Sequence, residues 1–131
     1  MKTLLNEWVG EGMIYETPIL RHTTDSNRPV TNFLLILDQP YKSKKGQTND
    51  FVIKHRIEKI PITAWANVAE QIHESGFVQN DFVRIKGAIR TRLVEDRKGA
   101  KHCAFEIICS EIKRAETTKE TLPNQQPGTD K

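Results

Sequence analysis

The chain has 131 residues, of which 37% are hydrophobic and 28% are charged, which is the size and balance of one small globular domain. No apolar run approaches the ~20 residues that cross a bilayer, and charge appears too early in residues 1–7 for a signal peptide. We therefore expect a cytoplasmic protein with no membrane partner. Cys103 and Cys109 lie too far apart on one strand to form a disulfide, so we expect both in the core.

Positive charge is concentrated in two blocks, although the net charge of the whole chain is only +3. Residues 84–101 contain seven basic and two acidic residues, a local charge of +5, and residues 41–60 contain six and two, a local charge of +4. Charge that is clustered in this way is a more specific sign of a nucleic-acid partner than the total charge.

The predicted order of elements is three strands, one helix and two strands. A strand over residues 8–15 contains Gly10 and Gly12, and glycines inside a strand mark the bends that a small barrel needs. A turn-rich segment at 17–29 leads to a continuous apolar strand over 30–37. A lysine-rich loop at 40–49 then precedes a third strand over 51–62.

The spacing of apolar residues predicts a helix over residues 64–75. Trp65, Val68, Ala69 and Ile72 fall on one stripe of this helix. Thr63 is the expected N-cap, and Gly76 is placed for a left-handed C-cap.

The segment 81–93 alternates as a strand does, with an apolar face and a basic face. The basic face carries Arg84, Lys86, Arg90 and Arg92. A charged turn over 94–101 leads to a final strand over 103–113. Residues 1–115 thus form the expected domain, and residues 116–131 are expected to be a disordered polar tail, because they contain a single large apolar residue, Leu122.

The four cations of the basic face have two interpretations. They form a solvated barrel surface paired with acidic residues on neighbouring strands, or a surface that follows phosphates. The second is favoured because both flanking loops carry further cations, which are Lys42, Lys44 and Lys45 in one and Arg97, Lys98 and Lys101 in the other. Lys54 and Arg56 on the third strand are further candidates for contact with DNA.

Few aromatic residues are available for stacking on unpaired bases. Tyr41 is the clearest candidate, since it lies beside Lys42 in a polar loop. The helical spacing of Trp65 favours the core over the surface. Phe33 and Phe105 are expected in the core, and Phe82 fits either place.

Motifs of enzyme chemistry are missing from the sequence, which has no phosphate-binding loop, no HExxH and no nucleophile elbow. His102, Cys103 and Cys109 do not have the spacing of a zinc site, because neighbours on a strand point to opposite faces. We predict a non-enzymatic protein without a metal or a cofactor.

The chain resembles the bacterial single-stranded DNA-binding protein (SSB) family from about residue 7 to residue 115. The resemblance rests on motifs in the family's order: Val30-Thr31-Asn32-Phe33, Tyr41-Lys42-Ser43-Lys44, the passage from Ile62 to Glu70, Gly87-Ala88-Ile89-Arg90-Thr91-Arg92, and the turn Glu95-Asp96-Arg97-Lys98-Gly99. It implies an all-β, five-stranded OB-fold barrel, with the helix between strands three and four, that binds single-stranded DNA.

The resemblance also implies roles for single residues. Trp65 and Tyr41 match stacking positions of the family, and Arg90 and Arg92 match strand cations near the DNA. Family members assemble as homotetramers, which is the favoured state here, with a homodimer as the alternative.

Departures from the family leave other functions open. Leu93-Val94 replaces an aromatic residue, and the chain ends in Gly128-Thr129-Asp130-Lys131 in place of the acidic peptide that recruits replication proteins. The alternatives are a PriB-like primosomal restart protein, which would bind replication or primosome partners as a dimer, and an OB-fold RNA-binding module.

Overall fold

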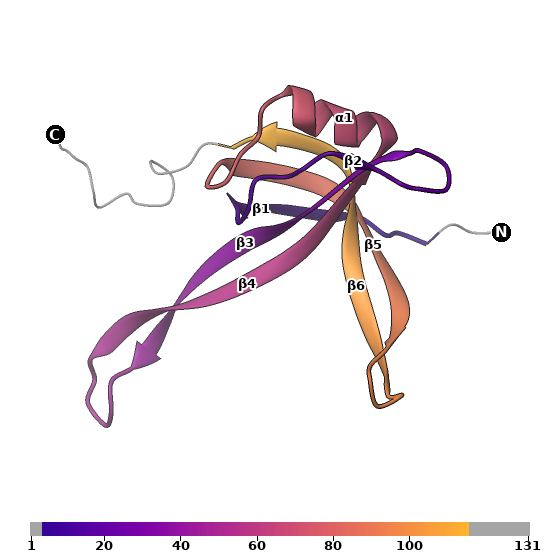
Figure 1. The fold of residues 1–131 in the computed structure, drawn as a ribbon. Helices are drawn as coiled ribbons and strands as arrows, with labels where there is room; N and C mark the ends of the chain where they lie inside the picture. Colours follow the sequence, from indigo (N-terminus) through magenta and orange to yellow (C-terminus); the bar gives the residue numbers. More distant parts are fainter. Residues whose placement is uncertain (1–3, 116–131) are drawn as a thin grey trace, which may run out of the picture.

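A computed structural model describes residues 4–115 of the chain. Its elements are β1 (Trp8–Ile14), β2 (Arg21–His22), β3 (Pro29–Lys44), β4 (Phe51–Trp65), α1 (Ala66–Glu74), β5 (Phe82–Glu95) and β6 (Lys101–Arg114). The two-residue β2 is an addition to the predicted turn-rich segment. The other five strands are the predicted ones, and α1 lies between the third and the fourth of them, as expected (Figure 1). The predicted tail, residues 116–131, lies outside the described residues.

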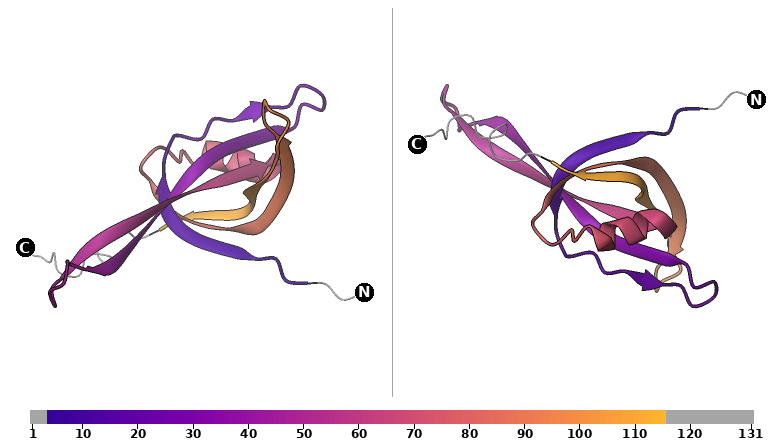
Figure 2. Two further views of the ribbon diagram at one scale, coloured as in Figure 1. Left: turned by 90° about the horizontal axis from the view of Figure 1, so that it is seen from below. Right: turned by 90° about the horizontal axis from the view of Figure 1, so that it is seen from above.

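The five long strands close into a barrel. They are paired in the order β1-β5-β6-β4-β3, and β1 returns to pair with β3 through Met13–Ile36 and Ile14–Leu35. β4 and β6 are parallel, whereas the other neighbours are antiparallel. Gly12 is needed where β1 crosses β3, because a Cβ atom there would lie 2.1 Å from the carbonyl oxygen of Ile36. Views along the barrel show the closed ring (Figure 2).

The core consists of the inward side chains of the barrel, and α1 covers one end of it (Figure 1). Ile14, Leu35, Ile85 and Ile107 are fully buried, and Ile72 of α1 packs against the same cluster. Burial of this much aliphatic surface is the main term that stabilises such a barrel.

Two of the expected core residues are exposed. Phe33 is buried as predicted, but Phe105 is 46% exposed. Cys109 is buried, and burial raises the pKa of its thiol to about 11, whereas Cys103 is exposed. Phe105 and Cys103 were assigned to the core because the apolar pattern of the last strand continues past the point where the strand leaves the barrel.

Two hairpins extend beyond the barrel wall, β3–β4 and β5–β6 (Figure 1). The pairing of β3 with β4 continues to Lys44–Phe51, and that of β5 with β6 continues to Glu95–Lys101. The prediction of a loop over residues 40–49 was therefore wrong for its first half. The apolar face predicted for β5 is also only half buried, since Leu93 on the hairpin is 71% exposed.

The helix begins two residues later than predicted. Thr63 is not its N-cap but a residue of β4, and the N-cap position is held by Trp65, whose backbone is extended and whose side chain makes no capping bond. Ala66 turns the chain with a φ of 54°, in the left-handed region that alanine rarely adopts. Gly76 has a φ of 74° after the helix, as the C-cap prediction requires.

Candidate nucleic-acid interface

A chain of hydrogen bonds crosses the outer face of the barrel between the two hairpins. An Arg21 Nη donates to Asn32 Oδ1, Asn32 Nδ2 donates to Thr63 Oγ1 at 2.8 Å, and the Thr63 hydroxyl donates to Glu106 Oε1. Arg90 Nη2 lies 3.4 Å from the other oxygen of Glu106. We call these five residues the cross-strand network. It links β2, β3, β4, β6 and β5, and so fixes polar side chains across the width of the sheet.

A pocket of about 300 Å³ opens on the same face. Its lining includes Asn32, Leu34, Thr63, Arg92, Phe105 and Glu106. The pocket therefore combines apolar surface with two carboxylates, those of Glu16 and Glu106, and the guanidinium of Arg92.

Trp65 lies at the end of β4, two residues beyond Thr63 and on the same face of the strand. Its side chain is half-buried, and the guanidinium of Arg28 lies 4.6 Å from the centre of its ring. The inference from helical spacing that Trp65 belongs to the core was wrong, because the strand continues through Trp65. An aromatic ring at this position, partly open to solvent, is suited to stacking on a base.

The β3–β4 hairpin carries basic side chains on both faces. Tyr41 is paired across the strands with Lys54, and the guanidinium of Arg56 lies 5.2 Å from the centre of the Tyr41 ring. Lys42 and Lys44 point to the opposite face. Tyr41 is 42% exposed, so the hairpin presents an aromatic ring among cations.

The turn of this hairpin contains Lys45, whose backbone N–H donates to the carbonyl of Asp50. Tyr41, Lys42 and Lys44 lie on the strand before this turn and not in a loop as predicted. A paired strand holds these side chains in fixed directions, which a loop would not.

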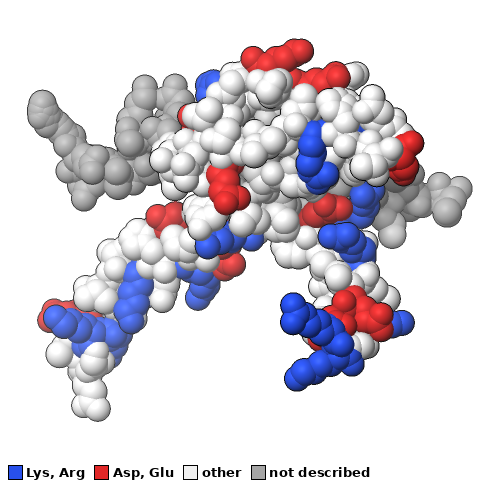
Figure 3. Space-filling model, in the orientation of Figure 1, with Lys and Arg blue, Asp and Glu red and all other residues white. Residues whose placement is uncertain are grey.

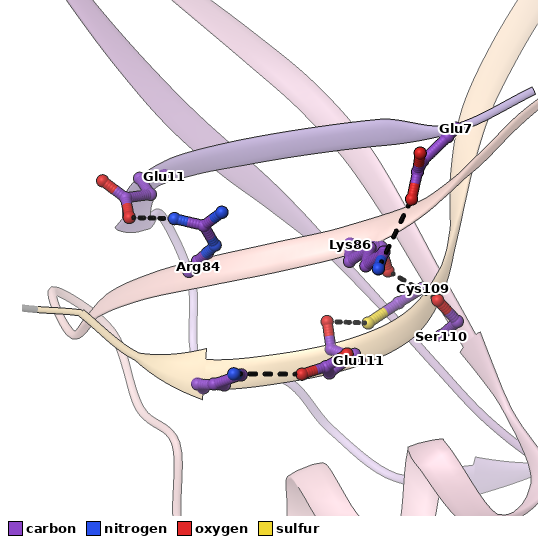
Figure 4. Close-up of polar contacts among 8 residues, drawn as sticks. Glu7, Glu11, Arg84, Lys86, Cys109, Ser110 and Glu111 are labelled. Carbon is purple, nitrogen blue, oxygen red and sulfur yellow. Dashed lines mark hydrogen bonds and ion pairs between the residues drawn. The ribbon is translucent and has the colours of Figure 1, made fainter.

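Three of the four cations predicted on β5 have carboxylate partners. Arg84 Nη1 lies 3.1 Å from Glu11, and Lys86 Nζ lies 3.4 Å from Glu7 (Figure 4). The third is Arg90, through Glu106. The structure thus supports the paired-surface interpretation for part of this strand, although exposed pairs of this kind are weak and do not prevent a phosphate contact.

Arg92 differs from the other three, since among the described residues it has no carboxylate oxygen within 4.0 Å. It lines the pocket beside Glu106. Arg92 is therefore the cation of β5 that is best placed to contact a phosphate.

The tip of the β5–β6 hairpin is shaped by Asp96. Its carboxylate accepts the backbone N–H groups of Lys98 and Ala100, both at 2.9 Å, and lies 3.0 Å from His102 Nε2. The hydrogen bond with His102, followed by that with Ala100, holds the pKa of Asp96 below its ordinary value. Arg97 and Lys98 are exposed on this tip. Figure 3 shows that basic side chains follow both hairpins, with acidic ones among them.

Sequence reasoning missed Asn32, Thr63 and Glu106 as parts of the site. The partner of Arg90 could have been found by counting. Lys98 lies at the centre of the turn, and residues at equal distances before and after it are paired across the hairpin. By this rule Arg90 is opposite Glu106, as the structure has it. No sequence signal marks the contact between Glu106 and Thr63, which joins two parallel strands far apart in the chain.

Residues 5–115 match the Single-strand binding protein family. The chain belongs to this family. It is similar to two proteins named single-stranded DNA-binding protein. That of Caldanaerobacter subterraneus subsp. tengcongensis is 30% identical over 111 residues, 84% of this chain and 67% of the relative. That of Clostridium tetani is 28% identical over 109 residues, 83% of this chain and 69% of the relative.

A solved structure, described as Plasmodium falciparum SSB in complex with ssDNA, has the same architecture. The two chains superpose with a TM-score of 0.73 at 17% identity, covering 88% of this chain and 99% of the other. The predicted OB-type barrel is thereby confirmed. Membership in a family of binding proteins also agrees with the prediction that the chain is not an enzyme. Within residues 4–115, no helix has the length and apolarity that crossing a membrane requires.

Proposed function

We propose that this protein binds single-stranded DNA independently of its sequence, on the outer face of the barrel and along both hairpins. The observation that carries the proposal is the placement of aromatic rings beside cations, Trp65 with Arg28 and Tyr41 with Lys54 and Arg56. Arg90 and Arg92 lie on the same outer face, where Arg90 contacts Glu106 and Arg92 lines the pocket. Stacking would supply affinity for bases, and the cations would displace counterions from phosphates.

The remaining cations of the hairpins would extend the path of the strand. These are Lys42, Lys44, Lys45, Arg97 and Lys98, with Arg84 and Lys86 as weaker candidates because their charges are shared with Glu11 and Glu7. The ligand would be the single strands that arise in replication, recombination and repair, and a cytoplasmic, nucleoid-associated location is part of this proposal.

A titration at several salt concentrations tests the function. A labelled thymidine oligomer, its RNA counterpart and a duplex of equal length are compared by fluorescence anisotropy. We expect tight binding of the DNA single strand, weakening linearly with the logarithm of salt concentration, and much weaker binding of the duplex. Equal affinity for the duplex would refute the proposal, and tighter binding of the RNA would favour the RNA-binding alternative.

Assembly into a homotetramer is the second part of the proposal. Residues 8–12 of β1 pair with β5 alone within the described residues, which leaves one backbone edge open to another strand. Val9 on this strand is 46% exposed. Size-exclusion chromatography with light scattering should give four times the mass of the chain. A dimer would favour the PriB-like alternative, in which the barrel also binds primosome proteins.

A further inference from the structure

We propose that the pocket beside Glu106 holds one nucleobase and prefers guanine to thymine. This inference rests on the proposed function and deepens it, because it adds a modest base preference to a surface that otherwise binds any single strand. The pocket lies on the outer face between the hairpins, next to Arg92 and two strand positions from Trp65.

The size and the lining of the pocket fit a flat ring. Its volume of about 300 Å³ is at the small end of ligand pockets. Leu34 and Pro61 supply apolar surface on the face of the sheet that carries Thr63 and Glu106. Phe105 also borders the pocket, but as the neighbour of Glu106 in β6 its side chain points to the opposite face. A base that covers Leu34 and Pro61 would remove this apolar surface from water.

The polar wall of the pocket is held in one orientation. Glu106 has a side chain that is only 21% exposed, and it accepts hydrogen bonds from Thr63 on one oxygen and Arg90 on the other. A carboxylate accepts about four hydrogen bonds. Among residues 4–115, each oxygen of Glu106 therefore keeps one acceptor position, and Thr63 is itself fixed by Asn32.

Two adjacent acceptors select a base that has two adjacent donors. The Watson–Crick edge of guanine presents N1–H and an N2 amino hydrogen side by side, which a carboxylate can bind with both oxygens. Thymine presents one N3–H between two carbonyl oxygens, and these would repel the carboxylate. Cytosine has a single donor group, its N4 amino group, and should lie between the two.

The test places one guanine in a thymidine oligomer, so that guanines cannot pair with one another. Binding is measured by fluorescence anisotropy for oligomers that carry guanine, inosine or thymine at the central position. We expect the guanine oligomer to bind about fivefold to tenfold more tightly than all-thymidine, as one bidentate contact would give. Inosine lacks the N2 amino group and should lose most of this gain.

Three variants assign the preference to the carboxylate. Glu106→Gln keeps an oxygen for Thr63 and should bind thymidine more tightly than the wild type does, while showing no guanine preference. Glu106→Asp keeps the negative charge but shortens the side chain. It should therefore lose the guanine preference and keep the thymidine affinity of the wild type. Glu95→Gln is the matched control, because it removes a carboxylate from the same hairpin outside the pocket, and it should keep the full preference. A thermal melt of each variant establishes that it is folded.

The outcomes separate this inference from the function on which it rests. Tight thymidine binding without a guanine preference would overturn the pocket and leave single-strand binding intact, as would a preference that persists in Glu106→Gln. A wild-type protein that binds none of the oligomers would overturn both.

Discussion

The hydroxyl of Thr31 is buried in the core without a hydrogen-bond partner among the described residues. A buried polar group without a partner destabilises the folded state. Thr31→Val replaces the hydroxyl by a methyl group of similar size. We expect the free energy of unfolding to rise by about 1 kcal/mol, measured by urea denaturation.

The same substitution at Thr63 is the control. Thr63→Val removes the central member of the cross-strand network, so it should lower the free energy of unfolding. A decrease in the Thr31 variant as well would mean that the Thr31 hydroxyl has a partner, such as a bound water.

Trp65 should contribute more to DNA binding than any single cation of the hairpin tips. Trp65→Ala removes a stacking ring, at a cost of about 1–3 kcal/mol, whereas Arg97→Ala removes one exposed charge. Titration of both variants with a thymidine oligomer measures the difference. Equal losses, or a Trp65→Ala protein that is unfolded by circular dichroism, would show that the ring serves the barrel and not the ligand.

At the scale of single elements, the loop after α1 is tied to the last strand through Asp81. Its carboxylate accepts the N–H of Val78 at 2.9 Å and pairs with Arg114 at 3.0 Å. Arg114 also donates to the carbonyl of Ser75 and lies over the Phe77 ring. The hydrogen bond from Val78 is the main cause, and Arg114 a further one, of the lowered pKa of Asp81.

This lowered pKa predicts a loss of stability in acid. The carboxylate stabilises the folded protein fully above the ordinary carboxyl pKa of 3.8, and this contribution disappears as the pH falls below that value toward the lower pKa of the folded state. Melting temperatures measured from pH 6 to pH 3 should fall less steeply below pH 4 in Asp81→Asn than in the wild type. Parallel profiles would mean that Asp81 is not linked to folding.

The sequence predicts the elements of this fold better than their ends. Alternation of apolar residues identified β5 correctly, but it continues through Ile89 and Leu93, and nothing in the pattern tells where a strand leaves the barrel. The start of α1 was misplaced because Trp65 has helical spacing, while the break that keeps it in β4 is a left-handed alanine, Ala66, which has no sequence signature.

The candidate site was predictable to a similar degree. Cations and rings are visible in the sequence as residue types, and the hairpins brought most of them together. Their partners were not visible, because Glu7 reaches Lys86 and Glu11 reaches Arg84 through the pairing of β1 with β5. Contacts between strands that are distant in sequence depend on barrel closure, which local patterns do not encode.

At the scale of the whole molecule, the charges on β5 divide into two groups. Arg84 and Lys86 lie among Glu7, Glu11 and Glu111 on the barrel wall, and Arg90 and Arg92 lie toward the hairpin. Arg84 and Lys86 are both paired with carboxylates, whereas Arg92 has no ion pair among the described residues. Electrostatic attraction of DNA should therefore be stronger at the second group.

The salt dependence of binding should reveal this division. Arg92→Ala should flatten the log–log slope of affinity against salt by about 0.7, the single-strand value per phosphate. Arg90→Ala should change it less, because Glu106 already shares its charge. Arg84→Ala, a matched change on the same face of the strand, should change it least. An Arg84 effect as large as that of Arg92 would extend the DNA path onto the barrel wall.

Beyond the barrel, the two strands of the β3–β4 hairpin pair only with each other among the described residues, which restricts how the length of the hairpin can vary among relatives. One residue added to each strand would turn every side chain beyond the insertion to the opposite face. Two residues added to each strand would preserve the faces and lengthen the arm by roughly 7 Å. Insertions and deletions on the barrel side of Tyr41 that keep Tyr41, Lys54 and Arg56 on their present face should therefore occur in multiples of four residues.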